Sequence, residues 1–441
     1  MEDAYIIKGG KPLRGQVKLS GAKNVALKVI IASLMFEGKV ILKNVPRIND
    51  VLELLHLIKI LGGRAEFIEE NTLQIEGKKL SKNKVDLYHG SKVRVSFMLA
   101  APLLYQFKEC FIPNPGGCRI GARPIDRIVE GMRKIGIMVE YDSQTGFYKV
   151  SLEKKPGGYY RFPKPSHTGT EFLILLSALS DKKTIIENAA MEPEVDELIR
   201  FLNESGGNIY RRQSTIVIEG VSKLKQKKVF NIIADRNEAV TYASLAVASG
   251  GEIKIGKIPF PLIATFIKKL ETVGGGFIQL GEGEYKFFYQ KRLKSSRIET
   301  SPHPGFMTDW QPNWAVLMTQ ASGESIIIER VFENRFSYVG ELKKLGAQIN
   351  FIEIPIKNPE SYFFFNFDPQ KIYQQAIRII GPQTLHGGVL NIHDLRAGAT
   401  LVIAALVAPE ESIINGASIL ERGYENFVDK IKILGGEIRK I

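Results

Sequence analysis

The chain has 441 residues, of which 44% are hydrophobic and 24% are charged, and these fractions are typical of globular proteins. Its length favours two domains, and no apolar run reaches the ~20 residues that a membrane span needs. Sixty Lys and Arg residues against 47 Asp and Glu residues give a net charge of +13, which favours an anionic partner. Because the N-terminal sequence lacks a secretory signal pattern, we expect a cytoplasmic protein without membrane insertion.

The cysteines and histidines argue against a disulfide framework and a metal site. The only two cysteines are Cys110 and Cys118, too few for a disulfide framework and without metal-type spacing. The six histidines form no metal-spaced pair. We therefore predict free thiols and no metal. We also expect no cofactor.

Six segments along the chain share one pattern, in which amphipathic helical spacing ends at a glycine and an alternating, strand-like tail follows. The marker glycines are Gly62, Gly136, Gly206, Gly274, Gly346 and Gly435. The steps between them are 74, 70, 68, 72 and 89 residues, so the sixth unit carries about 20 extra residues, which we place within 352–391.

A more apolar helix pattern precedes each of these segments. The six patterns span residues 23–39, 93–107, 169–183, 237–251, 309–324 and 396–411. Helices that are apolar all round are expected to be buried, and a strand should follow each one. The unit is therefore helix, strand, helix, strand, and six units form two sets of three with helices inside and sheets outside. The two sets divide near residue 234.

Polar residues stand at the starts of the buried helix patterns, where a core does not need them: Lys23, Asn24, Arg94, Thr168, Thr170, Asp235, Arg236, Asp309, Asp394 and Arg396. Helix N-termini attract anions, so several of them converging would form an anion site. Ordinary helix capping remains an alternative for the Asp, Thr and Asn residues. Lys and Arg oppose the helix dipole, so a bound anion explains Lys23, Arg94 and Arg396 better than capping does.

Several stretches carry a resemblance to a known family: LSGAKNVAL, NVPRINDV, NPGGCRIGARPID, TIIENAAMEPE, ADRNEA, SPHPGFMTDWQ, VFENRF, HDLRAGATLV and ERGYENF. In these stretches, across nearly the whole chain, the sequence resembles the enolpyruvyl transferases, and within them the branch that acts on UDP-N-acetylglucosamine. The resemblance implies an inside-out α/β barrel fold with two similar domains, each of three repeated helix-strand-helix-strand units. The first domain would span 23–234 and carry the Cys118 loop, the second would combine 1–22 with 235–441, and the active site would lie between them.

The implied reaction moves the enolpyruvyl group of phosphoenolpyruvate to the 3-hydroxyl of UDP-N-acetylglucosamine and releases phosphate, the first committed step of peptidoglycan precursor synthesis. The implied partners are these two substrates. We expect neither nucleic-acid binding nor a membrane partner, and we expect a monomer. Two alternatives stay open: enolpyruvyl transfer to a different nucleotide or nucleotide-sugar acceptor, and an inactive paralogue with a regulatory or scaffold role.

The catalytic residues implied by the resemblance are Cys118, Asp309 and Lys23. Arg119 and Arg123 flank Cys118 in a glycine-rich stretch, and such a setting lowers the pKa of a thiol. By resemblance, Cys118 is a general acid and the residue that fosfomycin alkylates. Asp309 would accept the proton of the sugar hydroxyl, with an N-cap role as the alternative. Four cations would surround phosphoenolpyruvate: Lys23, Arg123, Arg396 and Arg422.

The resemblance assigns substrate binding to further residues: Asn24, Arg94, Arg123, Pro124, Ile125, Asp126, Arg127, Ser166, Val331 and Asp394. Two positions depart from the family pattern. The chain has SHTGT from Ser166 to Thr170 where the family usually has Ser-Val-Gly-Ala-Thr, and Asn49 replaces a residue that is often basic. These departures concern the nucleotide sugar and leave the enolpyruvyl donor unchanged.

Overall fold

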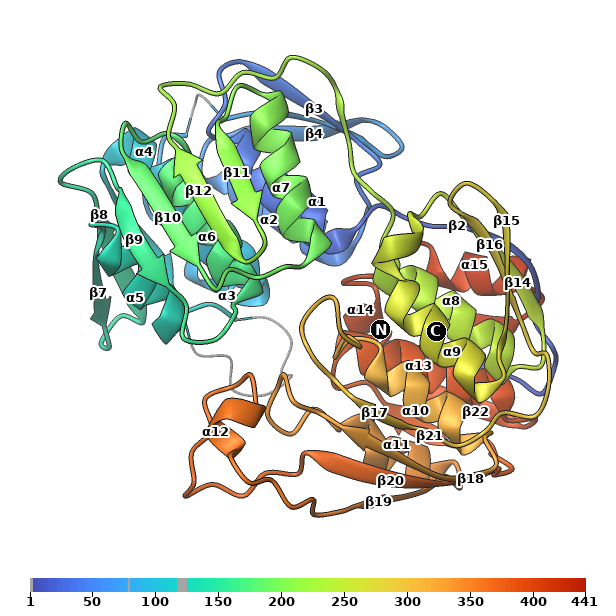
Figure 1. The fold of residues 1–441 in the computed structure, drawn as a ribbon. Coiled ribbons are helices and arrows are strands. Elements are labelled where there is room, and N and C mark those ends of the chain that lie inside the picture. Colours follow the sequence, from blue (N-terminus) through green and yellow to red (C-terminus); the bar gives the residue numbers. More distant parts are fainter. Residues whose placement is uncertain (1–2, 78–79, 117–124) are drawn as a thin grey trace. The chain divides into compact units, whose positions relative to one another are not determined.

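The computed structural model describes residues 3–77, 80–116 and 125–441, which divide into two compact units. We call residues 21–116 and 125–233 the middle unit, and residues 3–20 and 234–441 the terminal unit because it contains both ends of the chain. Figure 1 shows the middle unit in blue to green and most of the terminal unit in yellow to red. Each unit has its own hydrophobic core.

Three sheets build the middle unit, and their strands are given in spatial order. The first sheet contains β13 (Phe230–Asn231), β3 (Lys39–Lys43), β5 (Thr72–Glu76) and β4 (Arg64–Glu69). The second contains β6 (Glu109–Pro113), β8 (Phe147–Ser151) and β7 (Met138–Asp142). The third contains β11 (Ile209–Arg212), β12 (Thr215–Glu219), β10 (Lys183–Glu187) and β9 (Gly158–Arg161).

The terminal unit also contains three sheets. The first has β21 (Val389–Asn391), β22 (Glu411–Asn415), β1 (Ala4–Lys8) and β23 (Glu437–Lys440). The second has β15 (Gly276–Gly281), β16 (Glu284–Phe288), β14 (Glu252–Gly256) and β2 (Arg14–Lys18). The third has β17 (Arg297–Glu299), β18 (Gly323–Ile328), β20 (Ala376–Gly381) and β19 (Gln348–Phe351). The N-terminal strands β1 and β2 thus belong with strands from the C-terminal half.

One pairing pattern recurs in these sheets. In five of them an edge strand pairs in parallel with its neighbour. The next two strand pairs of each sheet are antiparallel, as in the β10–β12 and β11–β12 pairs. The β6–β8–β7 sheet has the two antiparallel pairs, and a parallel bridge joins Lys84 to Phe111 at its edge. The predicted α/β class is confirmed, and the mixed sheets close into no barrel within the described ranges.

The helices of the middle unit are α1 (Lys23–Ser33), α2 (Asn49–Ile60), α3 (Leu87–Lys92), η1 (Arg94–Leu99), α4 (Ala100–Phe107), α5 (Asp126–Lys134), α6 (His167–Ala178) and α7 (Pro193–Glu204). The predicted burial of the apolar helices is confirmed. Every residue of α1 except Asn24 is buried, and α6 is buried from Gly169 onward. By contrast, α5 and α7 bury one face, because their apolar residues are spaced along a single stripe.

The helices of the terminal unit are α8 (Arg236–Ala248), η2 (Phe260–Leu262), α9 (Ala264–Val273), α10 (Gln311–Thr319), α11 (Tyr338–Lys344), α12 (Pro359–Tyr362), α13 (Leu395–Val407), α14 (Ala417–Leu420) and α15 (Phe427–Ile433). All of α10 is buried, and α8 and α13 are each buried except for their last residue. These three helices pack against one another and form the centre of the unit (Figure 1).

The six marker glycines end helices as predicted. They lie after α2, α5, α7, α9, α11 and α15, and each has a positive φ between 87° and 101°. Residues with a side chain rarely adopt this left-handed conformation, so glycine allows the chain to leave the helix and enter the following strand. The sequence period therefore reflects a repeated helix-to-strand connection.

The extra residues of the longest step form one extension of the terminal unit, residues 352–375, between β19 and β20. The corresponding antiparallel strands of other sheets are joined by short turns, at residues 70–71, 213–214 and 282–283. The extension thus belongs to the β17–β18–β20–β19 sheet, the fifth in chain order, so its predicted place in the sixth unit is wrong, because the marker glycine Gly346 precedes the last two strands of this sheet. The extension contains the short helix α12 (Figure 1).

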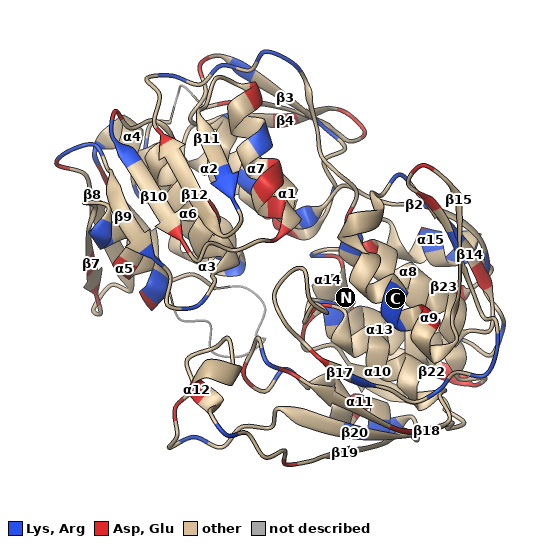
Figure 2. Cartoon of the chain, in the orientation of Figure 1, with Lys and Arg blue, Asp and Glu red and all other residues tan. Residues whose placement is uncertain are grey.

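Charged residues are distributed over both units. Figure 2 shows basic and acidic side chains interspersed along the helices and strands of each unit, so the excess of basic residues is not confined to one element. No helix in the described part of the chain has the length and apolarity needed to cross a membrane.

Candidate functional site

Two predicted site residues of the terminal unit lie at the starts of its buried helices. Asp235, the N-cap of α8, accepts hydrogen bonds from two backbone N–H groups at 2.7 and 3.3 Å. Asp394 caps α13 in the same way, at 2.8 and 3.1 Å. Each carboxylate therefore satisfies the unpaired N–H groups of its helix, which is the role that capping predicts.

Asp309 has a different environment. The N-cap of α10 is Trp310, without a side-chain capping bond, so the alternative that Asp309 caps this helix is wrong. Its Oδ1 lies 2.8 Å from Nη2 of Arg335, and its Oδ2 lies 3.4 Å from Nε of Arg396. Burial would raise the pKa of Asp309, but the two guanidinium groups outweigh burial and hold the pKa well below its usual range. The carboxylate is therefore ionised and paired twice.

Arg396 connects this carboxylate to a second helix start. The residue is 5% exposed, its Nη2 lies 3.8 Å from Oδ2 of Asp235, and its guanidinium lies over the ring of Tyr424. Burial would lower the pKa of Arg396, but Tyr424, Asp235 and Asp309 together raise it. Its Nη1 is buried and has no hydrogen-bond partner among the residues that the structure describes. That N–H group can donate to an anionic ligand.

Arg335 was not predicted as a site residue, although it lies in the family-like stretch VFENRF. Its side chain is 3% exposed, and its Nη1 donates to the hydroxyl of Thr308 at 2.8 Å. Thr308 in turn donates to Glu329 at 2.8 Å. The other oxygen of Glu329 accepts from the backbone N–H groups of Val331 and Phe332 at 2.7 and 3.0 Å. Val331, which is predicted to bind the sugar substrate, is thus connected through hydrogen bonds to Arg335 and so to Asp309.

Arg422 lies two residues before Tyr424 in the sequence. It is partly buried in the turn after α14, where its backbone N–H donates to the carbonyl of Ile419 at 3.4 Å. Tyr424 is the aromatic partner of Arg396. The Tyr424 hydroxyl lies 2.8 Å from Oγ1 of Thr241 on α8, which fixes the position of the ring.

In the middle unit, Lys23 begins α1 and is buried. Its Nζ lies 2.7 Å from Oδ2 of Asp50, in the first turn of α2. Asn24 follows as the one residue of α1 that is not buried. The sequence predicts a bound anion at Lys23, and the structure places a protein carboxylate there. A substrate anion at Lys23 would have to compete with Asp50 or join it.

The start of α6 contains the departure from the family pattern. Ser166 is the N-cap and accepts from the N–H of Gly169 at 3.2 Å. Nε2 of His167 lies 3.3 Å from one carboxylate oxygen of Glu171, and Nζ of Lys28 on α1 lies 3.1 Å from the other. Glu171 is fully buried, so one buried carboxylate is placed between two basic side chains.

The His167 pair predicts a pH dependence of stability. Burial would lower the pKa of His167, but Glu171 raises it above its usual value of 6.5, with Glu192 adding to this and Lys28 opposing it. A raised pKa in the folded state means that the pair stabilises fully below about pH 6.5 and that this stabilisation is lost as the pH rises through the folded value. Compared with His167→Gln, the wild type should lose stability as the pH rises from about 6.5 upward.

Urea unfolding across this pH range measures the effect, with the exposed His386→Gln as the control substitution. Parallel profiles of stability against pH for the wild type and His167→Gln would contradict the prediction, because they would show that Glu171 does not stabilise the protonated imidazole.

The remaining predicted residues of the middle unit lie at two other element starts. Arg94 begins η1, and burial lowers its pKa. Ile125 is the N-cap of α5, followed by Asp126 and Arg127, and burial is the main cause that lowers the pKa of Arg127. Three predicted residues lie outside the described part of the chain: Cys118, Arg123 and Pro124.

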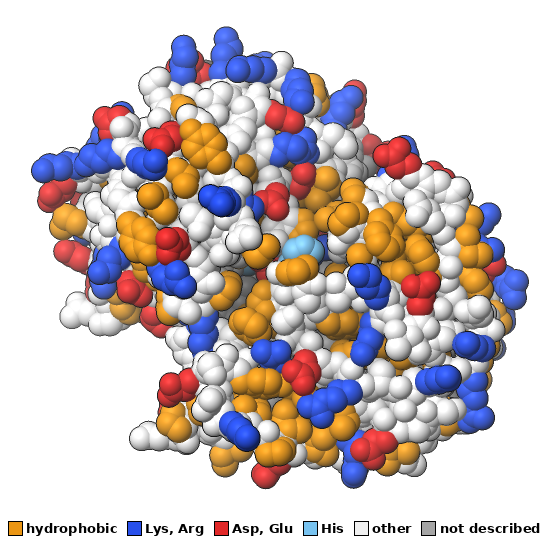
Figure 3. All heavy atoms as spheres, viewed as in Figure 1, with side chains coloured by type: hydrophobic (Ala, Val, Ile, Leu, Met, Phe, Trp, Pro, Cys, Tyr) orange, Lys and Arg blue, Asp and Glu red, His pale blue; other side chains and the backbone are white. Residues whose placement is uncertain are grey.

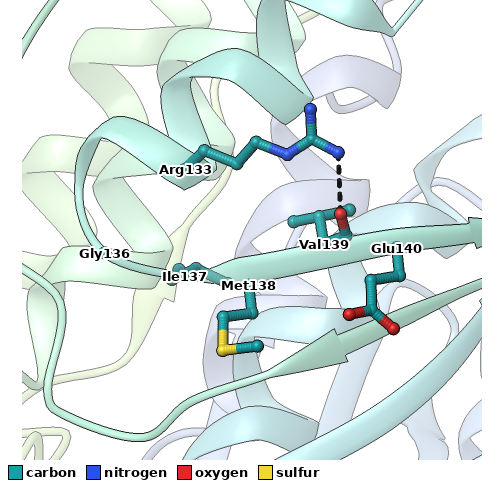
Figure 4. Close-up of a pocket in the computed structure, with 6 residues that line it drawn as sticks. All are labelled: Arg133, Gly136, Ile137, Met138, Val139 and Glu140. Carbon is teal, nitrogen blue, oxygen red and sulfur yellow. Dashed lines mark hydrogen bonds between the residues drawn. The ribbon is translucent and has the colours of Figure 1, made fainter.

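An open hollow of about 400 Å³ lies at the far end of α5, around the turn that leads into β7. Figure 4 shows its lining residues, with Arg133 donating to the carbonyl of Val139 at 2.8 Å. The predicted residues Asp126 and Arg127 are at the opposite end of the helix. This hollow therefore does not belong to the predicted site. Within the described ranges, no group of three His, Cys, Asp or Glu side chains could hold a metal ion.

Comparisons with known proteins cover the whole chain. The family model described as EPSP synthase (3-phosphoshikimate 1-carboxyvinyltransferase) matches residues 7–431. The chain is 36% identical to the UDP-N-acetylglucosamine 1-carboxyvinyltransferase of Thermodesulfovibrio yellowstonii, with all of both sequences covered. It is 35% identical to the protein of the same name from Thermotoga maritima, covering 99% of this chain and 98% of that one.

Solved structures show the same fold at lower sequence identity. The enolpyruvyl transferase NikO from Streptomyces tendae aligns with a TM-score of 0.85 and 21% identity, over 100% of this chain and 99% of that chain. An EPSP synthase from Acinetobacter baumannii aligns with a TM-score of 0.71 and 16% identity, over 99% of this chain and 100% of that chain.

Proposed function

Because this chain belongs to the enolpyruvyl transferase family, we propose that it transfers the enolpyruvyl group of phosphoenolpyruvate to the 3-hydroxyl of UDP-N-acetylglucosamine, with release of phosphate. The observation that carries this proposal is identity of 34–36% over at least 99% of the chain to proteins named UDP-N-acetylglucosamine 1-carboxyvinyltransferase. The reaction is the first committed step of peptidoglycan precursor synthesis.

We further propose that the middle and terminal units are the two domains of an inside-out α/β fold, each with three repeats. The recurring sheet pattern of one parallel and two antiparallel pairs supports this. The six helix-ending glycines, three in each unit, support the same repeat count. Buried helices at the centre of each unit agree with helices inside and sheets outside.

The residues proposed to bind the enolpyruvyl donor, phosphoenolpyruvate, are Lys23, Arg123, Arg396 and Arg422. Phosphoenolpyruvate carries a carboxylate and a phosphate, and guanidinium groups bind such oxygens through paired N–H donors. Arg396 suits this role because its buried Nη1 has no partner within the described residues. Cations fixed in this way would also stabilise the anionic tetrahedral intermediate of addition and elimination.

Asp309 is the proposed base. While both arginines pair with it, its pKa is too low for it to accept a proton from a sugar hydroxyl efficiently. A donor anion that binds Arg396 would withdraw one of the two cations, and the pKa of Asp309 would then rise toward its ordinary value. Donor binding would thus strengthen the base before the acceptor reacts.

The residues proposed to bind the acceptor, UDP-N-acetylglucosamine, are those that the family resemblance implies: Asn24, Arg94, Ile125, Asp126, Arg127, Ser166, Val331 and Asp394, with Arg123 and Pro124. The partly exposed Asn24, Arg94 and Arg127 can reach a ligand from the middle unit. Asp394 is 2% exposed and occupied as a helix cap, so we propose that it acts by orienting the start of α13, where Arg396 lies.

Phosphate release tests the proposal directly. Purified protein should release phosphate from phosphoenolpyruvate when UDP-N-acetylglucosamine is added, and the sugar product should gain the mass of an enolpyruvyl group. A panel of other nucleotide sugars tests the alternative acceptors that His167 leaves open. Release with a different member of the panel alone would replace the acceptor, and no release with any member would favour the inactive paralogue.

Fosfomycin should modify Cys118 and not Cys110. Cys110 lies in β6 and is fully buried, and burial, together with Glu109, raises the pKa of its thiol well above its usual value. A buried thiol of this kind is unreactive, whereas the basic sequence around Cys118 favours a thiolate. Peptide mass spectrometry after epoxide treatment measures the label on each cysteine, and label on Cys110 alone would contradict the prediction.

A further inference from the structure

The extension at residues 352–375 replaces a short turn, and its own side chains hold it together. Phe363 and Phe365 stack with ring centres 4.8 Å apart, and Phe363 stacks on Phe367 at 5.8 Å. Tyr373 packs against Phe365 and Phe367, each at 5.2 Å. Figure 3 shows hydrophobic side chains gathered on this part of the terminal unit. The extension is therefore an ordered part of the fold with a small aromatic core.

A first junction attaches the extension to Arg330, the residue before Val331. The guanidinium of Arg330 lies 4.2 Å from the ring centre of Tyr362 and donates twice to the Tyr362 carbonyl, at 3.2 and 3.1 Å. The N–H of Phe364 donates to the Arg330 carbonyl at 2.8 Å. Glu299 pairs with Arg330 at 3.4 Å and accepts from the Tyr362 hydroxyl at 3.0 Å. Arg330 is therefore engaged by both its backbone and its side chain.

A second junction is made by Gln375, which is 5% exposed at the end of the extension. Its amide nitrogen donates to the carbonyls of Glu329 and Phe332 at 2.7 and 2.9 Å. Its amide oxygen accepts from the N–H of Asn334 at 2.6 Å. The side chain of Asn334 accepts in turn from the N–H of Gln374 at 2.7 Å. One buried amide thus joins three backbone groups of a single turn.

The segment held by the two junctions, residues 329–335, is the one that places groups in the proposed site. Arg335 ends it and pairs with Asp309 at 2.8 Å. Glu329 begins it and orients Val331. Losing this amide is costly, because the carbonyl of the fully buried Glu329 would remain without its partner and the two part-buried bonds to Phe332 and Asn334 would be lost with it. The extension is therefore coupled to the position of Arg335.

We infer that the extension 352–375 is a positioning element of the catalytic site, and that Gln375 is a positioning residue which fixes the 329–335 turn and so holds Arg335 against Asp309. The inference rests on the proposed function in one respect, namely that Asp309 acts on the substrate. Its structural part, the coupling between Gln375 and the turn, is independent of which substrates the protein uses.

Gln375→Leu tests the inference, because it removes all three hydrogen bonds with a side chain of similar size. Gln320→Leu is the matched control: Gln320 is a partly buried glutamine of the same unit whose amide donates to Thr319 and to the Gln383 carbonyl. In Gln375→Leu, hydrogen exchange of the amides of residues 331–336 should accelerate at least about tenfold, and in Gln320→Leu it should not change.

Turnover gives the second readout. A displaced Arg335 should lower kcat about tenfold or more, since small misplacements of catalytic groups have effects of this order. The KM for phosphoenolpyruvate should change much less, because Arg335 is not among the residues proposed to bind phosphoenolpyruvate. Loss of one cation from Asp309 should also raise the pKa of this carboxyl, so the acid limb of the kcat/KM profile should move to higher pH.

Arg330→Met, which loosens the first junction and leaves Gln375 intact, provides a second variant if Gln375→Leu does not fold. Unchanged exchange at 331–336 in the folded variant would overturn the inference. Accelerated exchange with kcat within about twofold of an active wild type would overturn it as well. If the wild type itself releases no phosphate, the proposed function falls, and the exchange measurement still decides whether the extension fixes the turn.

Discussion

Asp309→Asn should lower turnover about a hundredfold or more, the usual contribution of a placed base. The amide keeps the size of the side chain but cannot accept the proton of the sugar hydroxyl. It also removes the negative charge that pairs with Arg335 and Arg396, so the site becomes more positive. Binding of the anionic donor should therefore not weaken, and the loss should appear in kcat.

Steady-state phosphate release and calorimetric titration with phosphoenolpyruvate separate these two effects. Asp429→Asn, at an exposed carboxylate on α15, controls for the loss of one acidic residue from the same unit. Turnover within about threefold of the wild type would remove Asp309 from proton transfer and leave it a role in orienting the two arginines.

Of the proposed substitutions, Lys28→Met should lower the free energy of unfolding most. Lys28 is in the middle of α1, and its Nζ lies 3.1 Å from the carboxylate of Glu171, which is fully buried. Methionine fills similar space but leaves a buried carboxylate with only the His167 pair. Removing one partner of a buried ion pair costs about 3 kcal/mol or more of unfolding free energy. We expect this loss in the middle unit.

Lys183→Met is the matched control, because Lys183 forms an ion pair with Glu219 at 3.0 Å on the surface of the same unit. Exposed pairs of this kind contribute less than about 1 kcal/mol. Urea unfolding, together with hydrogen exchange in α1 and α6, measures both variants. Equal losses in the two variants would show that burial of Glu171 adds nothing to the strength of its pairing.

The parts of the fold that local sequence determines could be predicted. The apolar composition of residues 396–411 predicts a buried helix, and the structure has α13 (Leu395–Val407) there. A glycine such as Gly62 ends its helix because the connection needs a positive φ. Both signals lie within about one helical turn of the feature that they predict. The repeat could be recognised for the same reason, since it recurs in local patterns.

The pairings within the candidate site could not be predicted, because they join residues that are distant in sequence. Nothing near Lys23 indicates that Asp50 would neutralise it, and nothing near Asp309 indicates that Arg335 would hold it. The stretch VFENRF contained a usable signal for Arg335, because an arginine beside a predicted sugar-binding segment is a candidate ligand. The N-cap alternative for Asp309 failed because α10 begins one residue later than a cap at 309 requires.

The pairing of β1 with β22 and β23 has a consequence for protein synthesis. The chain emerges from the ribosome in order, and domains generally fold as units during translation. All residues of the middle unit are available once residue 233 has been made, whereas β1, at residues 4–8, pairs with strands that end at Asn415 and Lys440. β1 must therefore wait until residues up to 440 have been made before its sheet can form, with Tyr5 and Ile7 still outside the core that they later join.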